Sequence, residues 1–270
     1  MITQDTLTTI LIAASTAAAT KSAEEGPAKT LVDIWNIALG HFFSCASEKV
    51  KIFWTDFFIP DLTQKISSIP EENLQEPKIS IVGPSLEASK YYFDEKEIRD
   101  MFANLIASSM NSTYNGLVQH SFVEIIKQLS PLDAKILKDL HGVNPIIDIE
   151  YEYNFKTSNH LKLALGNEAI KLLENLYFSE KIPESELNLI SIENLFKQGL
   201  ITIDKFNSLS DKKSYNHYLS SNIFNSYKKD IENKIPPFDK EDGTLNFSYH
   251  IVRLSNLGKA FKEVCIKDSL

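Results

Sequence analysis

Histidine and cysteine are the residue types in this chain that could bind a metal ion or pair a nucleophile with a base. The sequence contains six histidines and two cysteines. One pair, His41 and Cys45, has the i, i+4 spacing that places two side chains on the same face of a helix. Two ligands do not make a zinc site, and no H-E-x-x-H or C-x-x-C motif supplies further ones. The sequence therefore predicts no metal ion and no other cofactor.

The motifs of the common enzyme classes are also missing from the sequence. It has no glycine-rich phosphate loop, no G-x-S-x-G nucleophile elbow and no set of kinase motifs. Adjacent carboxylates such as Glu24–Glu25 and Glu71–Glu72 are most simply solvent-facing charges. We therefore expect a protein that is not an enzyme. An enzyme would have to assemble its active site from distant positions.

Lysines interleaved with tyrosines form a candidate binding site near the C-terminal end. Tyrosine rings can stack on bases while lysines neutralise phosphates, so this pattern suits a nucleotide or an oligonucleotide. The alternative is an amphipathic helix that packs on a neighbouring subunit. The candidate ligand-binding residues are Lys212, Lys213, Tyr215, Tyr218, Lys228 and Lys229.

The composition is that of a globular protein, with 43% hydrophobic and 24% charged residues. The net charge of −8 argues against binding of duplex DNA, because phosphate neutralisation needs a basic surface. Cys45 and Cys265 could form one disulfide, but without a signal peptide two reduced thiols are favoured. We expect a cytoplasmic protein that associates with a membrane, if at all, on activation.

Two runs near the N-terminus, residues 6–20 and 34–47, carry no charged side chain. Each is shorter than the roughly 20 apolar residues that span a bilayer. Helical spacing of apolar residues continues from Leu31 to Phe57, and it predicts either a buried core or oligomer-interface helix, or a segment that enters a membrane after activation. The acidic character of the region counts against passive membrane binding. The candidate interface or membrane residues are Trp35, Phe42, Phe43, Phe53, Trp54 and Phe57.

Several helices with clear start signals are predicted in the middle of the chain. Residues 94–111 show an apolar stripe, an adjacent seam of small residues, and Asp94 as the expected N-cap. Asn104 near that seam is either a buried polar determinant or a solvated asparagine. Ser121 and Ser130 are the expected N-caps of the next two helices.

A family resemblance covers the same region. The run ENLQEPKISIVGPSLEASKYYFDEKEIRDMFANLIASSMN, followed by HSFVEIIKQLSPLDAKIL, resembles the signature of the Abi-alpha (abortive infection alpha) family, most strongly over residues 70–140. The resemblance implies a helical bacterial protein linked to phage resistance through host-cell shutdown. It implies no catalytic residues.

The C-terminal part resembles a winged helix. Helices are expected at 167–178 and 191–198, a strand at 200–203 and a partner strand at 247–254. The segment between the strands, about 204–246, is too long for a wing, and its helical spacing predicts an inserted helix of about five turns. Glu193 and a single Lys197 make the helix at 191–198 a poor reader of the major groove.

Together these patterns predict a mainly α fold: a helical array with a small winged-helix-like α+β C-terminal region containing an inserted helix. The expected domains are 1–60 (apolar helices), 61–145 (helical core) and 146–270 (winged-helix-like). The family resemblance, together with the apolar N-terminal region, implies a non-enzymatic, homo-oligomeric antiphage effector that senses a trigger through its C-terminal region. Its N-terminal helices would harm the cell by membrane perturbation or pore formation. The alternative is a winged-helix adaptor that binds a partner protein or nucleic acid.

Overall fold

The computed structural model of the chain describes residues 54–76, 78–154, 167–235, 238 and 243–266. The chain divides into two compact units. One consists of residues 1–134 and 257–270, and the other of residues 135–256. Most of the aromatic N-terminal region lies outside the described residues.

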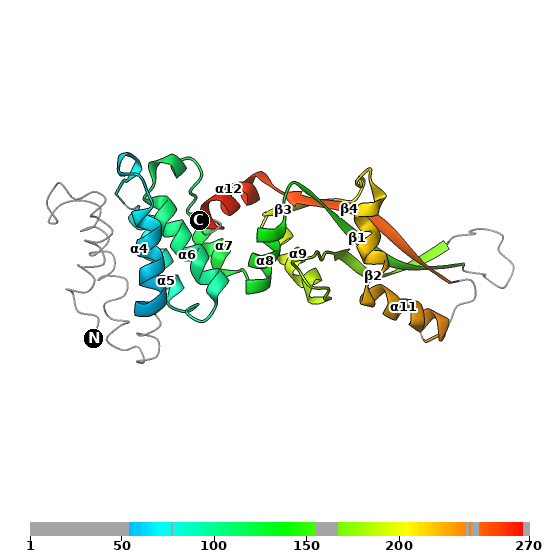
Figure 1. The fold of residues 1–270 in the computed structure, drawn as a ribbon. Coiled ribbons are helices and arrows are strands. Elements are labelled where there is room, and N and C mark those ends of the chain that lie inside the picture. Colours follow the sequence, from blue (N-terminus) through cyan, green and yellow to red (C-terminus); the bar gives the residue numbers. More distant parts are fainter. Residues whose placement is uncertain (1–53, 77, 155–166, 236–237, 239–242, 267–270) are drawn as a thin grey trace. The chain divides into compact units, whose positions relative to one another are not determined.

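The described part of the first unit is helical (Figure 1). Its elements are η1 (Trp54–Phe58, a π-helix), α4 (Ile59–Ser67), η2 (Glu71–Asn73), α5 (Ile79–Ser89), α6 (Lys96–Ser109), η3 (Ser112–Tyr114), α7 (Ser121–Lys127) and, from the other end of the chain, α12 (Asn256–Cys265).

Helix α6 is the centre of this unit and is buried along most of its length. Its Asn104 is only 4% exposed and donates Nδ2–H to the carbonyl oxygen of Cys265 at 2.9 Å. Ser108 donates its hydroxyl to the carbonyl of Val264 at 3.0 Å. These bonds satisfy carbonyls at the end of α12 that no later turn of that helix can reach. Asn104 is therefore a buried polar determinant, which decides between the two alternatives that the sequence left open.

One predicted helix cap is confirmed and two are wrong. Ser130 accepts a hydrogen bond from the Asp133 N–H at 3.1 Å, while the Asp133 carboxylate accepts from the Ser130 N–H at 2.7 Å. This reciprocal pair is a capping box. Helix α6, however, starts after Glu95 rather than Asp94, and α7 follows His120, in both cases without a side-chain cap.

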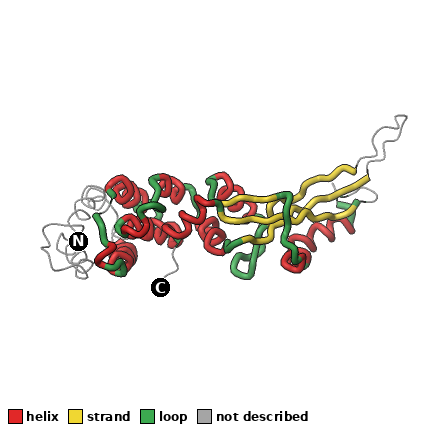
Figure 2. The backbone as a smooth tube through the Cα atoms, turned by 90° about the horizontal axis from the view of Figure 1, so that it is seen from above, coloured by secondary structure: helices red, strands yellow, loops and turns green. Residues whose placement is uncertain are grey.

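The second unit is built on a four-stranded antiparallel sheet, whose strands lie side by side in Figure 2. Helix α8 (Pro131–Asp139) leads into it. The strands have the order β2-β1-β4-β3. The elements of the unit are β1 (Val143–Asn154), β2 (Asn167–Leu176), α9 (Leu187–Lys197), β3 (Ile201–Asp204), η4 (Lys212–Tyr215), α10 (Asn216–Leu219), α11 (Asn222–Glu232) and β4 (Thr244–Leu254).

The two faces of the sheet differ in character, because side chains alternate along each strand. One face carries Ile147 and Ile149 of β1 together with Phe247 and Tyr249 of β4, and it packs against the buried Tyr215. The short helices η4 and α11 contact the strands on this side. The other face carries the alternate residues of β1 and β4, among them Asp148 and His250. This second face holds the polar site described below.

The predicted mainly α fold is wrong, because the second unit is organised around strands. Residues 167–178, expected as a helix, form β2 instead. Their apolar residues Ile170, Leu173 and Leu176 have the i, i+3 spacing of a helix, but two register shifts place an extra residue between them. All three therefore lie opposite residues of one face of β1. Strand pairing and β-bulges thus overrode a helical pattern.

The winged-helix expectation is corrected for the same reason. The predicted pairing of the two late strands is confirmed, since β3 pairs antiparallel with the end of β4. Yet β4 pairs with β1 along ten residues, so the two strands belong to a larger sheet rather than to a wing. The single inserted helix is also wrong. The segment forms the short helices η4, α10 and α11 instead. Ser221 lies between α10 and α11 and caps α11, since its hydroxyl accepts a hydrogen bond from the Phe224 N–H at 3.1 Å.

Candidate functional site

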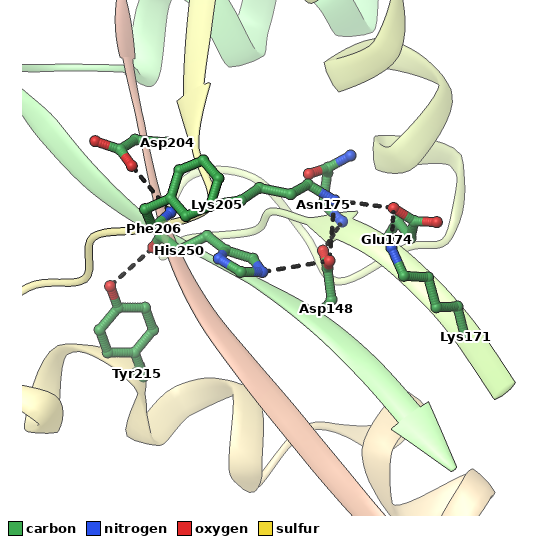
Figure 3. A network of polar contacts seen from close by, with 9 residues as sticks. All are labelled: Asp148, Lys171, Glu174, Asn175, Asp204, Lys205, Phe206, Tyr215 and His250. Atoms are coloured by element: carbon green, nitrogen blue, oxygen red, sulfur yellow. Dashed lines mark hydrogen bonds and ion pairs between the residues drawn. The ribbon is translucent and has the colours of Figure 1, made fainter. Parts of the chain in front are cut away.

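A single buried carboxylate, that of Asp148, organises the polar face of the sheet (Figure 3). Its Oδ1 accepts a hydrogen bond from the Asn175 N–H at 2.7 Å. Its Oδ2 accepts from Nζ of Lys205 at 3.0 Å and lies 3.3 Å from Nε2 of His250. The Asp148 side chain is only 2% exposed. One side chain thus connects β1 with β2, with β4 and with the loop that follows β3.

The bond from Asn175 exists because β2 bulges at this point. Asn175 has φ of 62°, in the left-handed region that asparagine tolerates better than most residues. The two register shifts between β1 and β2 occur at Ile147–Ile149 and Ile149–Glu150, next to Asp148. A bulged residue leaves the ladder with its backbone N–H unpaired. The Asp148 carboxylate pairs that N–H.

Lys205 joins the cluster to a second carboxylate. Its Nζ lies 2.9 Å from Oε2 of Glu174, and that oxygen is also 2.9 Å from Nζ of Lys171. Burial acts to lower the pKa of Lys205, but hydrogen bonds to Glu174 and Asp148 outweigh it, and the pKa is raised. The hydrogen bonds from Lys205 and Lys171 lower the pKa of Glu174. Both groups are therefore charged at neutral pH.

The residues after Lys205 form a turn held by Asp204. Its Oδ1 accepts hydrogen bonds from the backbone N–H of Phe206 at 3.0 Å and of Asn207 at 3.1 Å. Its Oδ2 accepts from Nδ2 of Asn207 at 2.8 Å and lies 3.6 Å from a guanidinium nitrogen of Arg253. The hydrogen bonds, that from the Asn207 side chain first, lower the pKa of Asp204. Between these anchors the side chain of Phe206 is 99% exposed.

His250 is buried without satisfying its ring nitrogens. The residue is 6% exposed, and neither Nδ1 nor Nε2 has a hydrogen-bond partner, so the 3.3 Å approach to Asp148 is a close polar contact only. A His–Asp pair would need a nucleophile on the free nitrogen to act as a catalytic base. The interactions described for His250 include no such hydroxyl or thiol. The arrangement positions a turn.

Comparison with known proteins identifies the family. The family model described as abortive infection alpha matches residues 53–265. The chain belongs to the abortive infection alpha family. This confirms the resemblance predicted from residues 70–140, and it supports a role related to abortive infection. No curated protein and no solved structure matches this chain.

In this abortive infection alpha protein the predicted ligand residues fall into two groups. The rings of Tyr215 and Tyr218 are fully buried, and their hydroxyls donate to the carbonyl oxygens of His250 at 2.8 Å and Pro145 at 3.0 Å. Stacking on a base would require either ring to leave the core. The four predicted lysines are exposed. Of these, Lys212 lies over the Tyr249 ring, with Nζ 5.0 Å from the ring centroid.

The predicted interface or membrane residues lie mostly outside the described residues. This holds for Trp35, Phe42, Phe43 and Phe53, and the Trp54 side chain is likewise not described. Phe57 is 52% exposed, with the Arg99 guanidinium 6.0 Å from its ring centroid. None of the described helices is long and apolar enough to cross a membrane.

None of the residues of the Asp148 network was predicted from the sequence as part of a site. No spacing rule connects Asp148, Lys205 and Glu174, because the bulge in β2 and the order of the strands in the sheet bring them together. The turn itself did carry a signal. Asp204 and Asn207 flank two residues directly after an apolar strand, and aspartate at that position favours a turn that its side chain closes. An aromatic residue inside such a polar turn was the overlooked feature.

Proposed function

We propose that this chain is a non-enzymatic, oligomeric effector of abortive infection that recognises a trigger through residues 135–256 and harms the host cell through residues before 60. Membership in the abortive infection alpha family is the observation that carries this proposal. The harm is physical, by disturbance of a membrane, and follows recognition of the trigger. The account of the N-terminal region rests on its two uncharged runs, 6–20 and 34–47, and on the aromatic residues that begin in the second run.

The character of the second unit supports a recognition role. Residues held in a strained backbone conformation cluster at binding and catalytic sites, where the surrounding structure imposes the strain. Among the described residues, the most exposed large hydrophobic side chain is Phe206, at 99%; the next is Tyr91 of the helical unit, at 68%. The polar network next to Phe206 holds a turn in place rather than reacting groups. Binding is the function that this arrangement serves best.

Infection of cells that carry the full chain or a chain lacking residues 1–60 tests the effector proposal. We expect the full chain to depolarise and kill infected cells, as followed with a potential-sensitive dye and by counting survivors. The shortened chain, if it remains folded by circular dichroism, is expected to do neither. Uninfected cells are the control for trigger dependence. Intact membrane potential and viability in infected cells with the full chain would contradict the proposal.

The class of trigger is a separate question. A nucleotide or oligonucleotide, as predicted from the sequence, would have to bind through exposed lysines without tyrosine stacking. The matching variant exchanges Lys213, Lys228 and Lys229 for glutamate. It leaves Lys212 in place, because that ammonium group packs on Tyr215 and Tyr249. Loss of protection with an unchanged melting temperature would favour an anionic trigger.

A further inference from the structure

We propose that Phe206 is the anchor through which residues 135–256 bind the trigger, and that the trigger is a protein with an uncharged apolar pocket that accepts one phenyl ring. The inference rests on the proposed function and names the partner class for it. Phenylalanine at 99% exposure is unusual, because its ring would ordinarily be buried. A ring of this kind buries about 150–250 Å² when it enters a pocket.

The turn that carries Phe206 is organised before any partner binds. On one side, the Lys205 side chain is held by Asp148 and Glu174. On the other side, Asp204 accepts hydrogen bonds from the side chain and the backbone N–H of Asn207, and also from the Phe206 N–H. Ordering a loop on binding weakens affinity, and a preformed turn avoids that cost. Only the ring of Phe206 remains to be fixed by the partner.

The charges around the turn favour an uncharged partner surface. Lys205 is paired with Asp148 and Glu174, Lys171 with Glu174, and Arg253 with Asp204. Three cationic groups thus face three carboxylates, and the set is neutral. Nucleic acids and anionic membranes are bound through cationic side chains that are free to meet phosphates. The cations beside Phe206 are already engaged, so an apolar protein pocket is the complementary surface.

The role of a trigger favours a different protein over a second copy of this chain, because a second copy is present before infection and cannot report it. Phe206 is flanked by Lys205 and Asn207, both polar and exposed, so it forms a single projection rather than a broad apolar face. A few residues carry most of the binding energy of an interface, and aromatic side chains that fill a pocket are common among them.

Three full-length variants test the inference in infected cells. Phe206→Ser removes the ring, Phe206→Leu keeps an apolar side chain, and Ile79→Ser alters a residue that is 66% exposed in the other unit. We expect protection to fall at least about tenfold with Phe206→Ser, as for truncation of a dominant interface residue. A smaller loss is expected with Phe206→Leu and none with Ile79→Ser. Melting temperature and the mass from light scattering should stay unchanged in all three.

Each other outcome contradicts a distinct part of the inference. Full protection by Phe206→Ser would contradict the role of Phe206 in binding the trigger. If Phe206→Ser had a lower mass than wild type in light scattering, Phe206 would bind a second copy of the chain. If Phe206→Ser sedimented less with vesicles of anionic lipid than wild type does, Phe206 would bind a membrane. Loss of protection in the three-lysine variant together with full protection by Phe206→Ser would point to an anionic trigger. A wild-type chain that gives no protection would contradict the proposed function itself.

Discussion

The two units differ in whether their buried polar groups have hydrogen-bond partners. In the helical unit, Asn104 and Ser108 use their side chains to bind the last carbonyls of α12, at 2.9 and 3.0 Å. In the strand-rich unit, buried polar atoms of Asn144, Asn175 and His250 have no hydrogen-bond partner. Within the described part of the chain, every side-chain atom of this kind belongs to residues 135–256. An unpaired buried polar group costs about 1–3 kcal/mol.

The backbone shows the same contrast. Among the described residues, those with a left-handed backbone are Gly142, Asn175, Gly199 and Lys234, and all of them lie in the strand-rich unit. Gly243 of the same unit is required by close approach instead of by φ, since a Cβ at that position would lie 1.8 Å from the hydroxyl of Tyr151. Glycine adopts the left-handed region freely, so the strain lies at Asn175 and Lys234. Strain of this kind persists where the surrounding structure imposes it, and it is common at functional sites.

The two units therefore differ in how far they depart from local rules of folding. The helical unit satisfies its polar groups and is built for packing. The strand-rich unit retains a bulge, unsatisfied atoms and a fully exposed phenylalanine around one buried carboxylate. Departures from local rules of this sort mark the places where function competes with stability. Substitutions in the two units should therefore have different consequences.

The largest expected effect is a loss of stability in the helical unit. Phe102 on α6 is fully buried, and Phe102→Ala should lower the free energy of unfolding by about 3–5 kcal/mol through lost burial and the cavity left behind. Ile79→Ala, at a residue that is 66% exposed, is the control and should change it by less than about 0.5 kcal/mol. Urea denaturation gives both values. Equal effects would mean that α6 is not the core of its unit.

A smaller effect is expected from the carboxylate that organises the polar face. Asp148→Ala leaves the Asn175 N–H without an acceptor and removes one partner of Lys205. We expect a loss of about 1–3 kcal/mol and reduced protection, because the Phe206 turn loosens. Glu193→Ala on α9, an exposed carboxylate of the same unit, is the matched control. A variant as stable and as protective as this control would contradict the positioning role of Asp148.

One substitution should stabilise the strand-rich unit. Asn175→Gly keeps the backbone N–H that Asp148 binds, relieves the left-handed strain and removes an unpaired buried oxygen. Because glycine also gains freedom in the unfolded chain, we expect a net gain of only about 0.5–1 kcal/mol. Asn175→Ala keeps the strain and should destabilise. If Asn175→Gly had a lower melting temperature than Asn175→Ala, the left-handed φ at the bulge would not be a source of strain.

The smallest expected effect is a pH dependence of the ion pairs. The pKa of Glu174 lies below its ordinary value of 4.5, so its stabilising contribution is complete above that value and is lost as the pH falls through the lowered pKa. The pKa of Lys205 lies above 10.5, so its contribution is complete below that value and is lost as the pH rises beyond it. The difference in melting temperature between wild type and Glu174→Gln should shrink between about pH 6 and pH 3. A constant difference would exclude the ion pair as its source.

The sequence predicted elements whose signals are local: helix α6 follows from its apolar stripe and the start of α8 from the Ser130 capping box. The pairing of β3 with β4 joins segments far apart in the sequence, and it was predicted from the resemblance to the two strands of a winged helix. The fold class was wrong because Ile170, Leu173 and Leu176 imitate a helix once two bulges intervene. Such bulges are set by partner strands, which a local pattern does not contain.

The candidate site was missed for a related reason. Asp148 and Lys205 are separated by 57 positions and meet only through the order of the strands. Tyr215 and Tyr218 show a second difficulty, because aromatic residues next to lysines resemble a stacking surface in the sequence whether their rings are buried or exposed. The turn of Asp204–Asn207 was within reach of sequence reasoning. Its aspartate and asparagine are turn formers, and only its exposed phenylalanine needed the structure.

A photo-crosslinking phenylalanine analogue at position 206 of the full-length chain tests the central claim most directly. We expect illumination of infected cells to yield one covalent adduct with another protein, absent before infection and absent with the same analogue at position 79. Phe206 would then meet a partner only when the trigger is present. An adduct with twice the mass of the chain, or adducts that do not depend on infection, would contradict this account.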